Sequence, residues 1–490
     1  MAIDRNEFIE RRLEKLTAIR ESGMDPYPPE TPSRLPVEDL RAAGDTEEPM
    51  ATSGRIMAKR KHGKTVFCDL HDPTGRIQLF MNGKVMGEEG WELLGNLDLG
   101  DIIWVKGPLF TTRTGELSVK VTDLLLLTKA VRPLPVVKTD SEGKVHDAVS
   151  DPDFLFRHRC VDLILNETSR NRFITRSRIL SASREYLDSN GFLEVETPVL
   201  QQIYGGAAAE PFVSYYNSME EECYLRIATE LYLKRLLAGG LHRVYEMGKD
   251  FRNEGVDRTH SPEFTQLELY EAWTDYRGMM DRFEGIVTAA AQAAGSGKNT
   301  VFMGNDINLE PPFERISFVP ALHEKSGEEL FEWNGEDLSR LASKLGLCED
   351  VSDRAVLLDK LFDHFVTPGL IQPCFVIDYP VELSPLAKQK PDEPRLTERF
   401  EAFIAGLELA NAFSEQNDPI YQRKILEAQA GESLHRKGVV DQEFLFALET
   451  GMPPAGGLGI GMDRLVMVLT NSVSIRDTIL FPHLRREKGI

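Results

Sequence analysis

A short stretch of the chain, residues 250–270 (DFRNEGVDRTHSPEFTQLELY), holds chemical groups that suit ligand binding. We interpret it as two strands joined by a polar loop, in which Gly255 permits a turn. In the second strand, alternate residues form an ordinary apolar face, and the residues between them carry an aromatic ring, an amide, a carboxylate and a phenol. These four residues are Phe264, Gln266, Glu268 and Tyr270. The ring could stack on a flat ligand, and the acid could hold a cation.

Positive side chains flank this polar face: Arg252, Arg258 and His260. A guanidinium holds a carboxylate or a phosphate through two parallel hydrogen bonds. The stretch therefore predicts sites for an anion, a flat ring and a cation, which a nucleotide and a cationic small molecule would fill together. The alternative is a hairpin whose wet face carries salt-bridged charges, because motif matches alone have many false positives.

Length and composition indicate a globular chain of two or three domains. The 490 residues carry a net charge of −21, which argues against indiscriminate nucleic-acid binding but not against a local basic patch. No apolar run is long enough to span a bilayer, and the N-terminus lacks the apolar core of a signal peptide. The five cysteines are scattered without a C-x-x-C pair, so we expect neither zinc nor disulfides, and a cytoplasmic location without a membrane partner.

Four segments are expected along the chain. Residues 1–49 are interpreted as an amphipathic helix and a linker, and residues 50–128 as a five-stranded barrel of the OB type. Residues 129–152 read as a second linker. The rest, residues 153–490, forms the main domain, with a mainly helical insertion at about residues 275–400.

The barrel carries a basic first strand and turn beside two aromatic residues, Phe67 and Phe80. Barrels of this type hold single-stranded bases with such groups. The alternative is that both rings belong to the core and that the Lys/Arg run is a solvated turn.

In the main domain, several blocks could supply further site residues. The loop QQIYGGAAAEPF contains Gly206, which permits close backbone approach to a ligand, and the helix TELYLKRLLAGG begins with Glu230. Near the C-terminus, GGLGIGMDRLVMVL is predicted to be a glycine-rich turn that opens a helix at Asp463 and Arg464.

Together these blocks resemble the class II aminoacyl-tRNA synthetases, and within them the lysyl-tRNA synthetases. GFLEVETPVL resembles motif 1, FRNEG and PEFTQLELY motif 2, and GLGIGMDRLVM motif 3; YLRIATELYLKRL and LELANAFSEQNDP also match. The resemblance covers nearly the whole chain. It implies an α+β protein with a six-stranded antiparallel sheet flanked by helices, an N-terminal OB barrel that reads the anticodon, and a homodimer built through motif 1.

The resemblance also implies a reaction, that of a lysine–tRNA ligase. The lysine carboxylate attacks the α-phosphorus of ATP to give lysyl-adenylate and diphosphate, and lysine then passes to the 3′-terminal ribose of tRNA(Lys). ATP is a substrate, and Mg²⁺, more than one ion per subunit, is the expected cofactor. No protein nucleophile is needed, because catalysis consists of positioning and charge stabilisation.

Residue roles follow from the same resemblance. Arg252 bridges the lysine carboxylate and the α-phosphate, and with Arg464 it is expected to be catalytic. The expected ATP-binding residues are Arg252, Glu254, Arg258, His260, Phe264 and Arg464. The expected lysine-binding residues are Gly206, Glu230, Arg252, Glu268, Tyr270, Asn411, Phe413 and Glu415. The expected metal ligands are Glu408 and Glu415, and the expected anticodon contacts are Arg55, Phe67, Gln78 and Glu116.

Two features need a structural explanation. Glu408 and Glu415 are seven residues apart, so a regular strand would point them to opposite faces unless a bulge intervenes or Glu415 lies past the strand end. In addition, the family loop usually reads GGA-x-ARPF, whereas this chain has GGAAAEPF, with Glu210 in place of the arginine.

Three alternatives remain open at this point. The sibling enzymes for aspartate and asparagine share the barrel and the motifs, although RNEG and TELYLKR favour lysine. A catalytically silent binding protein could keep the same fold. A protein-lysylating ligase is a third alternative, but such relatives lack the N-terminal barrel.

Overall fold

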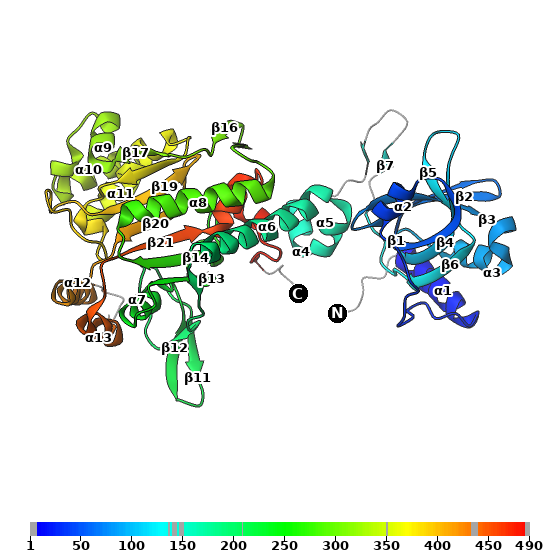
Figure 1. Ribbon diagram of the computed structural model, residues 1–490, viewed down its shortest axis with the longest axis horizontal. Helices are drawn as coiled ribbons and strands as arrows, with labels where there is room; N and C mark the ends of the chain where they lie inside the picture. Colours follow the sequence, from blue (N-terminus) through cyan, green and yellow to red (C-terminus); the bar gives the residue numbers. More distant parts are fainter. Residues whose placement is uncertain are drawn as a thin grey trace. The chain divides into compact units, whose positions relative to one another are not determined.

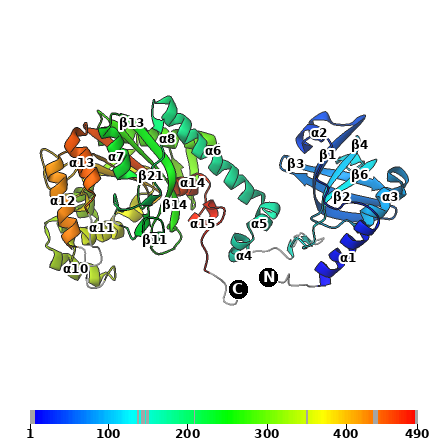
Figure 2. The same ribbon diagram turned by 90° about the horizontal axis from the view of Figure 1, so that it is seen from below.

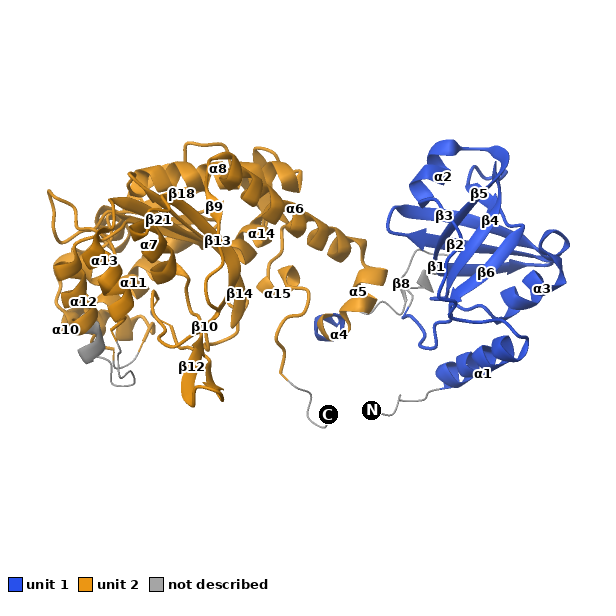
Figure 3. Cartoon of the chain, turned by 60° about the horizontal axis from the view of Figure 1, so that its bottom comes forward, with its two compact units in different colours: residues 1–155 blue, residues 156–490 orange. Residues whose placement is uncertain are grey.

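The computed structural model describes residues 7–135, 138–139, 145–146, 151–207, 209–348, 351–432 and 440–485. The chain divides into two compact units, residues 1–155 and residues 156–490 (Figure 3). Within the described residues, no helix combines the length and the apolar character needed to cross a membrane.

The first unit is a barrel, drawn in blue and cyan in Figure 1. Its strand order is β1-β2-β3-β5-β4-β6, and an additional pairing of β1 with β4 closes the sheet. The strands are β1 (Thr46–His62), β2 (Thr65–Asp72), β3 (Gly75–Asn82), β4 (Ile102–Thr111), β5 (Leu117–Lys120) and β6 (Asp123–Thr128). Three helices accompany them: α1 (Glu7–Glu21), α2 (Val37–Ala43) and α3 (Gly83–Asn96). The predicted OB-type barrel is therefore present.

The strand count differs from the five expected, because the last predicted strand is divided into β5 and β6. The chain bends at Val121 and Thr122, whose amides donate to Phe80 O and Lys106 O. At this bend the backbone passes directly over Gly107, where a Cβ would overlap the Lys120 carbonyl oxygen. Close approach of two backbones is a typical reason for glycine within a strand.

The second unit is built on an eight-stranded sheet of order β17-β18-β19-β20-β21-β14-β13-β9. Its strands are β9 (Leu193–Glu194), β13 (Arg243–Phe251), β14 (Glu263–Ala272), β17 (Glu314–Ser317), β18 (Cys374–Ile377), β19 (Arg399–Ile404), β20 (Leu407–Ser414) and β21 (Ala455–Gly461). The six central strands are antiparallel, as predicted. The two outermost strands, β9 and β17, each add a short parallel pairing to this sheet.

Helices of the second unit cover the sheet and extend from it (Figure 2). They are α5 (Arg159–Leu165), α6 (Glu167–Ser189), α7 (Glu230–Ala238), α8 (Tyr276–Ala294), α9 (Phe318–Ser326), α10 (Gly335–Lys344), α11 (Arg354–Phe365), α12 (Pro419–Glu432), α13 (Gln442–Gly451), α14 (Met462–Leu469) and α15 (Ile475–Thr478). The smaller strands of this unit are β10 (Leu200–Gln201), β11 (Val213–Tyr216), β12 (Glu221–Leu225), β15 (Asn299–Phe302) and β16 (Asn305–Asn308). Strands β7 (Lys138–Thr139) and β8 (Val145–His146) belong to the first unit, and helix α4 (Pro152–Arg157) contains the boundary between the units.

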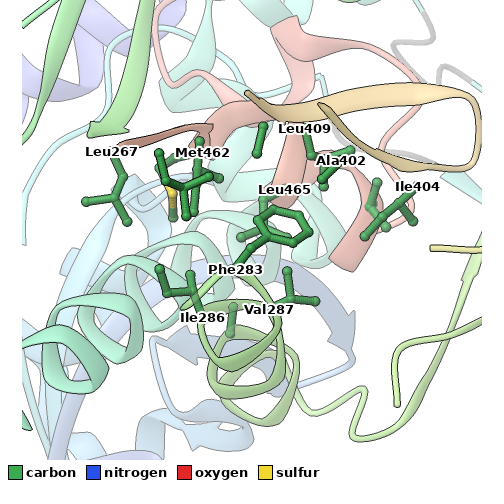
Figure 4. Close-up of a cluster of buried hydrophobic side chains, with 14 of the residues drawn as sticks. Leu267, Phe283, Ile286, Val287, Ala402, Ile404, Leu409, Met462 and Leu465 are labelled. Carbon is green, nitrogen blue, oxygen red and sulfur yellow. The ribbon is translucent and has the colours of Figure 1, made fainter. Parts of the chain in front are cut away.

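One face of the sheet forms the main hydrophobic core with α6, α8 and α14 (Figure 4). Leu267 and Leu269, the alternate apolar residues of β14, are fully buried in this core, as the sequence pattern predicts. Phe283 of α8 and Leu465 of α14 pack in the same cluster. The opposite face of β14 is thereby left for polar residues.

Residues 275–400, expected to be a mainly helical insertion, contribute to more than one layer. Helix α8 lies in the main core, and strands β17 and β18 extend the main sheet. Helices α9, α10 and α11 gather in a separate cluster, in which Phe318 and Phe362 stack with ring centroids 4.2 Å apart.

The segment GGLGIG is a strand and not the turn that we expected. It forms β21, in the middle of the sheet between β14 and β20. Leu458 and Ile460 enter the core, whereas Gly457 and Gly459 lie opposite Tyr270 and Glu268 on the polar face. The glycines keep the space above the strand open, and helix α14 begins directly after it.

Candidate active site

A cavity of about 1170 Å³ lies over the polar face of the sheet. It is bordered by β14, β20 and β21, by the loops around Gly206 and Glu254, and by the starts of α7 and α14. The structure gathers here every expected ATP- or lysine-binding residue except Arg258 and Glu415. The gathered residues are Gly206, Glu230, Arg252, Glu254, His260, Phe264, Glu268, Tyr270, Asn411, Phe413 and Arg464.

Arg252 lies beside the aromatic ring at one part of this cavity. Its guanidinium carbon is 5.1 Å from the centroid of the Phe264 ring, and its Nε donates to Ile227 O at 3.4 Å. Neither Nη nitrogen has a hydrogen-bond partner among the described residues. A planar donor pair is thus available next to a flat ring, which is the arrangement that a nucleotide phosphate and base require.

Glu254 and Glu210 lie together at the rim. The backbone N–H of Glu210 donates to Glu254 Oε1 at 3.4 Å, and the N–H of Asn253 donates to Glu210 O at 2.7 Å. Glu210 lines the cavity. The acid that replaces the usual arginine therefore borders the site.

A second cationic centre forms around Arg464, in the first turn of α14. Arg464 Nη1 donates to Glu408 O at 2.6 Å, and Nη2 is 3.0 Å from His260 Nε2. His260 is held from its other ring nitrogen by Asp257 at 2.9 Å. Arg258 does not line the cavity, and its Nη2 donates to Val473 O at 3.3 Å.

Acidic and phenolic groups gather at another part of the cavity, around Glu268. Gln266 Nε2 and Tyr270 Oη donate to the two Glu268 oxygens at 3.0 and 3.3 Å. Burial, together with repulsion from Asp250 and Glu230, raises the pKa of Glu268 to about 8. A buried carboxylate with neutral donors and acidic neighbours favours binding of a cation.

Sequence reasoning missed one member of this acidic region, Lys234 of α7. Its Nζ donates to Glu230 Oε1 at 2.6 Å and forms an ion pair with Glu415, and the side chain is completely buried. The rings of Phe413 and Phe444 lie 5.6 and 5.9 Å from Nζ. The Glu–Lys spacing of four residues in TELYLKR was the available signal, because it places both side chains on one side of a helix.

The structure explains the spacing of Glu408 and Glu415. The β19–β20 register shifts between the pairs Ala402↔Ala410 and Phe403↔Glu408, and Glu415 follows the last residue of β20. The irregularity and the position past the strand end both remove the strict alternation of a regular strand. As ligands of Mg²⁺, the two carboxylates stay a prediction.

Glu401, on the neighbouring strand β19, is the acid that interacts with Glu408. Burial, and then repulsion from Glu408, raises the pKa of Glu401 to about 8. Among the described residues, no three His, Cys, Asp or Glu side chains come close enough to hold an ion by themselves. Both Glu401 oxygens already accept hydrogen bonds, from Arg399 Nη2 at 2.6 Å and from Tyr379 Oη at 2.8 Å. A hard cation in the cavity would therefore take most of its oxygens from its ligand.

The barrel presents a row of rings on one face. Phe67, Phe80 and Phe110 contact each other edge to face, with centroids 5.5 and 5.6 Å apart. None of the three belongs to the buried cluster of the barrel, so the core interpretation of Phe67 and Phe80 is not supported.

The other expected anticodon residues already have contacts within the barrel. Gln78 accepts from Ser118 Oγ at 2.9 Å, and Glu116 pairs with Arg76 at 2.8 Å. Arg55 Nη1 donates to Gly100 O at 2.8 Å.

Comparison with known proteins identifies the class. The tRNA synthetases class II (D, K and N) match residues 151–485, and the OB-fold nucleic acid binding domain matches residues 51–127. The chain therefore belongs to the class II tRNA synthetases. Among its relatives, a lysine–tRNA ligase of Moorella thermoacetica is 47% identical over 98% of both chains, and one of Thermoanaerobacter pseudethanolicus is 46% identical over 98% of this chain and 96% of its own. One of Clostridium tetani is 43% identical over 98% of this chain and 96% of its own. Within the class, the chain therefore belongs to the lysine–tRNA ligase family.

We expect Gly457→Ala to disrupt the acidic part of the cavity. A Cβ at Gly457 would overlap Glu415 Oε1 and the Tyr270 ring, so both must shift. Overpacking of this kind costs about 1–3 kcal/mol, which thermal unfolding would measure. Gly461→Ala is the matched control, because its nearest neighbours are 3.7 Å away or farther. Equal stability of the two variants would contradict the packing argument.

Proposed function

We propose that this cavity activates lysine with ATP and then passes lysine to the 3′ end of tRNA(Lys). The observation that carries the proposal is the distribution of charge in one cavity. The two Nη donors of Arg252 lie beside the Phe264 ring, and the buried acids around Glu268 lie at another part of the same cavity. An acidic pocket of this kind favours a cationic side chain and opposes aspartate, which speaks against the sibling enzymes.

In the first step, a lysine carboxylate oxygen bonds to the α-phosphorus, and the bond from that phosphorus to the bridging oxygen of diphosphate breaks. Arg252 holds the carboxylate and an α-phosphate oxygen together. Phe264 stacks on adenine, and Glu254 accepts from the adenine amino group. His260 and Arg464 hold the outer phosphates, and Arg258, which in this structure donates to Val473 O instead, is expected to join them when ATP binds. Arg464 does so from the start of its helix, where backbone N–H groups also favour anions.

The lysine substrate is held at both of its amino groups. Glu268, Tyr270 and Glu415 bind the ε-ammonium. Glu230, Asn411 and the Gly206 backbone bind the α-amino end, and Phe413 packs against the aliphatic stem.

For Mg²⁺ we propose Glu408 and Glu415, the pair that the resemblance implies. The bound cation would neutralise charge on the phosphate oxygens. Glu408 lines the cavity, and its Oε2 lies 3.3 Å from Arg464 Nη1, beside the groups proposed for the outer phosphates. We expect Glu408→Gln to raise the Mg²⁺ concentration that gives half-maximal exchange by about tenfold, because changes at a metal site typically lower metal affinity by that amount. Glu393→Gln, at an exposed pair with Arg395, should leave this concentration unchanged. An unaltered Mg²⁺ requirement in Glu408→Gln would refute the assignment.

The decisive experiment is pyrophosphate exchange with each of the twenty amino acids. Lysine alone should support rapid exchange, and only with Mg²⁺. A silent binding protein would give none, and the sibling enzymes would respond to aspartate or asparagine. Transfer to tRNA, compared with the barrel present and deleted, would separate tRNA charging from protein lysylation.

We also propose that the barrel binds the anticodon through Phe67, Gln78, Glu116 and Arg55. Phe67→Ala is expected to lower kcat/KM for tRNA charging by about 10- to 100-fold and to spare exchange, because a stacked base is worth about 1–3 kcal/mol. Phe8→Ala, at an exposed ring of α1, is the control. If charging and exchange fell together, the effect would come from folding and not from tRNA contact.

A homodimer built through motif 1 remains part of the proposal. Leu193, Val199 and Leu200 of that motif are exposed apolar side chains, which supports an interface there. Sedimentation equilibrium would test it, and a monomer at micromolar concentration would contradict it.

A cytoplasmic location is proposed as well, in line with five free cysteines. Fractionation of cells would test this location.

A further inference from the structure

The buried ammonium of Lys234 lies between two acids that the proposed function assigns to different ends of the substrate. Glu230, one turn earlier on α7, accepts from Nζ at 2.6 Å. Glu415, just after β20, forms the second ion pair with the same nitrogen. Lys234 therefore links Glu230, proposed to bind the α-amino group of the substrate, to Glu415, proposed to bind its ε-ammonium group.

Lys234 is held in place more firmly than a surface ion pair would hold it. Its side chain has no exposed surface, and two aromatic rings, those of Phe413 and Phe444, surround Nζ. Glu230 and Glu415 are themselves buried. Removing one partner of such a buried ion pair leaves an unpaired charge in the interior, which strongly destabilises the folded protein.

We propose that Lys234 is a positioning residue that sets the separation of Glu230 and Glu415, and so makes the site selective for the length of its amino-acid substrate. One nitrogen contacts one oxygen of each carboxylate. The second Glu415 oxygen, Oε1, has no hydrogen-bond partner among the described residues and lies beside Gly457 and Tyr270. Glu230 lines the cavity, and Glu415 Oε1 lies beside two residues that line it, Gly457 and Tyr270.

A length-sensitive site would distinguish lysine from ornithine, which carries the same charges on a side chain shorter by one methylene group. In a site without this link, each carboxylate could move toward the shorter diamine. With the link intact, a shorter substrate leaves one buried acid without its ammonium partner. Such an unpaired group is the strongest source of discrimination available to a binding site.

The inference rests on the proposed lysine site, so the test begins with the unaltered enzyme. Calorimetric binding of lysine and lysine-dependent exchange in that enzyme establish the site, and their absence would refute the proposed function itself. Lys234→Met is then expected to raise KM for lysine at least tenfold and to lower the lysine-to-ornithine ratio of kcat/KM at least fivefold. KM for ATP should change less than twofold.

Two further variants keep the test decisive. Lys234→Arg keeps the positive charge that the two buried acids need, but it replaces the compact ammonium by a planar guanidinium. It should raise KM for lysine at least threefold and lower the lysine-to-ornithine ratio of kcat/KM. Arg235→Ala, at the next residue of α7, is the matched control; Arg235 does not line the cavity and lies over Tyr232. An unchanged ratio in Lys234→Arg, or equal losses for lysine and ATP in Lys234→Met, would overturn the inference.

Discussion

Arg252→Ala is expected to abolish lysine-dependent pyrophosphate exchange, with a loss of at least two to three orders of magnitude in kcat. Arg252 is the group that contacts both reacting anions in our proposal. Its free Nη donors lie in the cavity beside Phe264. Removing one preorganised donor of this kind costs about 3–4 kcal/mol of transition-state stabilisation. Exchange of radioactive diphosphate into ATP measures the effect directly.

Two controls make this result specific. Arg252→Lys keeps the charge but loses the bidentate fork, so it should recover only part of the rate. Arg277→Ala, at an exposed guanidinium over Tyr276, should leave exchange unchanged. Near-normal exchange in Arg252→Ala would contradict the bridging role.

Glu268→Gln is expected to raise KM for lysine by about 10- to 100-fold and KM for ATP by less than about twofold. The reason is that a buried charge-assisted contact to an ammonium is worth about 1.5–3 kcal/mol. The amide keeps the size of the side chain and its contacts to Gln266 and Tyr270. A larger effect on ATP than on lysine would refute the ammonium role.

The same residue predicts how lysine affinity depends on pH. Without a ligand, burial and acidic neighbours raise the pKa of Glu268 to about 8, so the carboxyl holds a proton at neutral pH. Binding of an ammonium requires the ionised form, and lysine must therefore displace that proton. KM for lysine should fall as pH rises from 6 to 8, by at most about tenfold per pH unit. Glu268→Gln should make this slope shallower, and a KM independent of pH in the unaltered enzyme would contradict it.

Local patterns in the chain were sufficient for much of the site. The alternation in PEFTQLELY placed Leu267 and Leu269 in the core and Glu268 and Tyr270 in the cavity. Strand period is a local property of the backbone, so it can be read without knowing the neighbours. The short strands of the barrel and the polar loop after Arg252 were accessible for the same reason.

Contacts between distant segments could not be read in this way. GGLGIG looks like a turn in isolation, and it is a strand because β14 and β20 pair with it on either side. The spacing of Glu408 and Glu415 suggested an irregular strand, but only the structure locates the register shift, which pairs Glu408 with Phe403. Neither pairing nor register is written in a single segment, because both depend on hydrogen bonds made across the sheet.

The amino-acid sequence by itself determined the class of this protein, the order of its two folded parts and the chemical types in its cavity, because these reside in local periodicity and in motif order. Only the tertiary structure decided which acids act together and that Lys234 joins two of them. Burial of a charge depends on what the rest of the chain packs around it, and a lysine on a helix looks the same in sequence whether water or two carboxylates surround it.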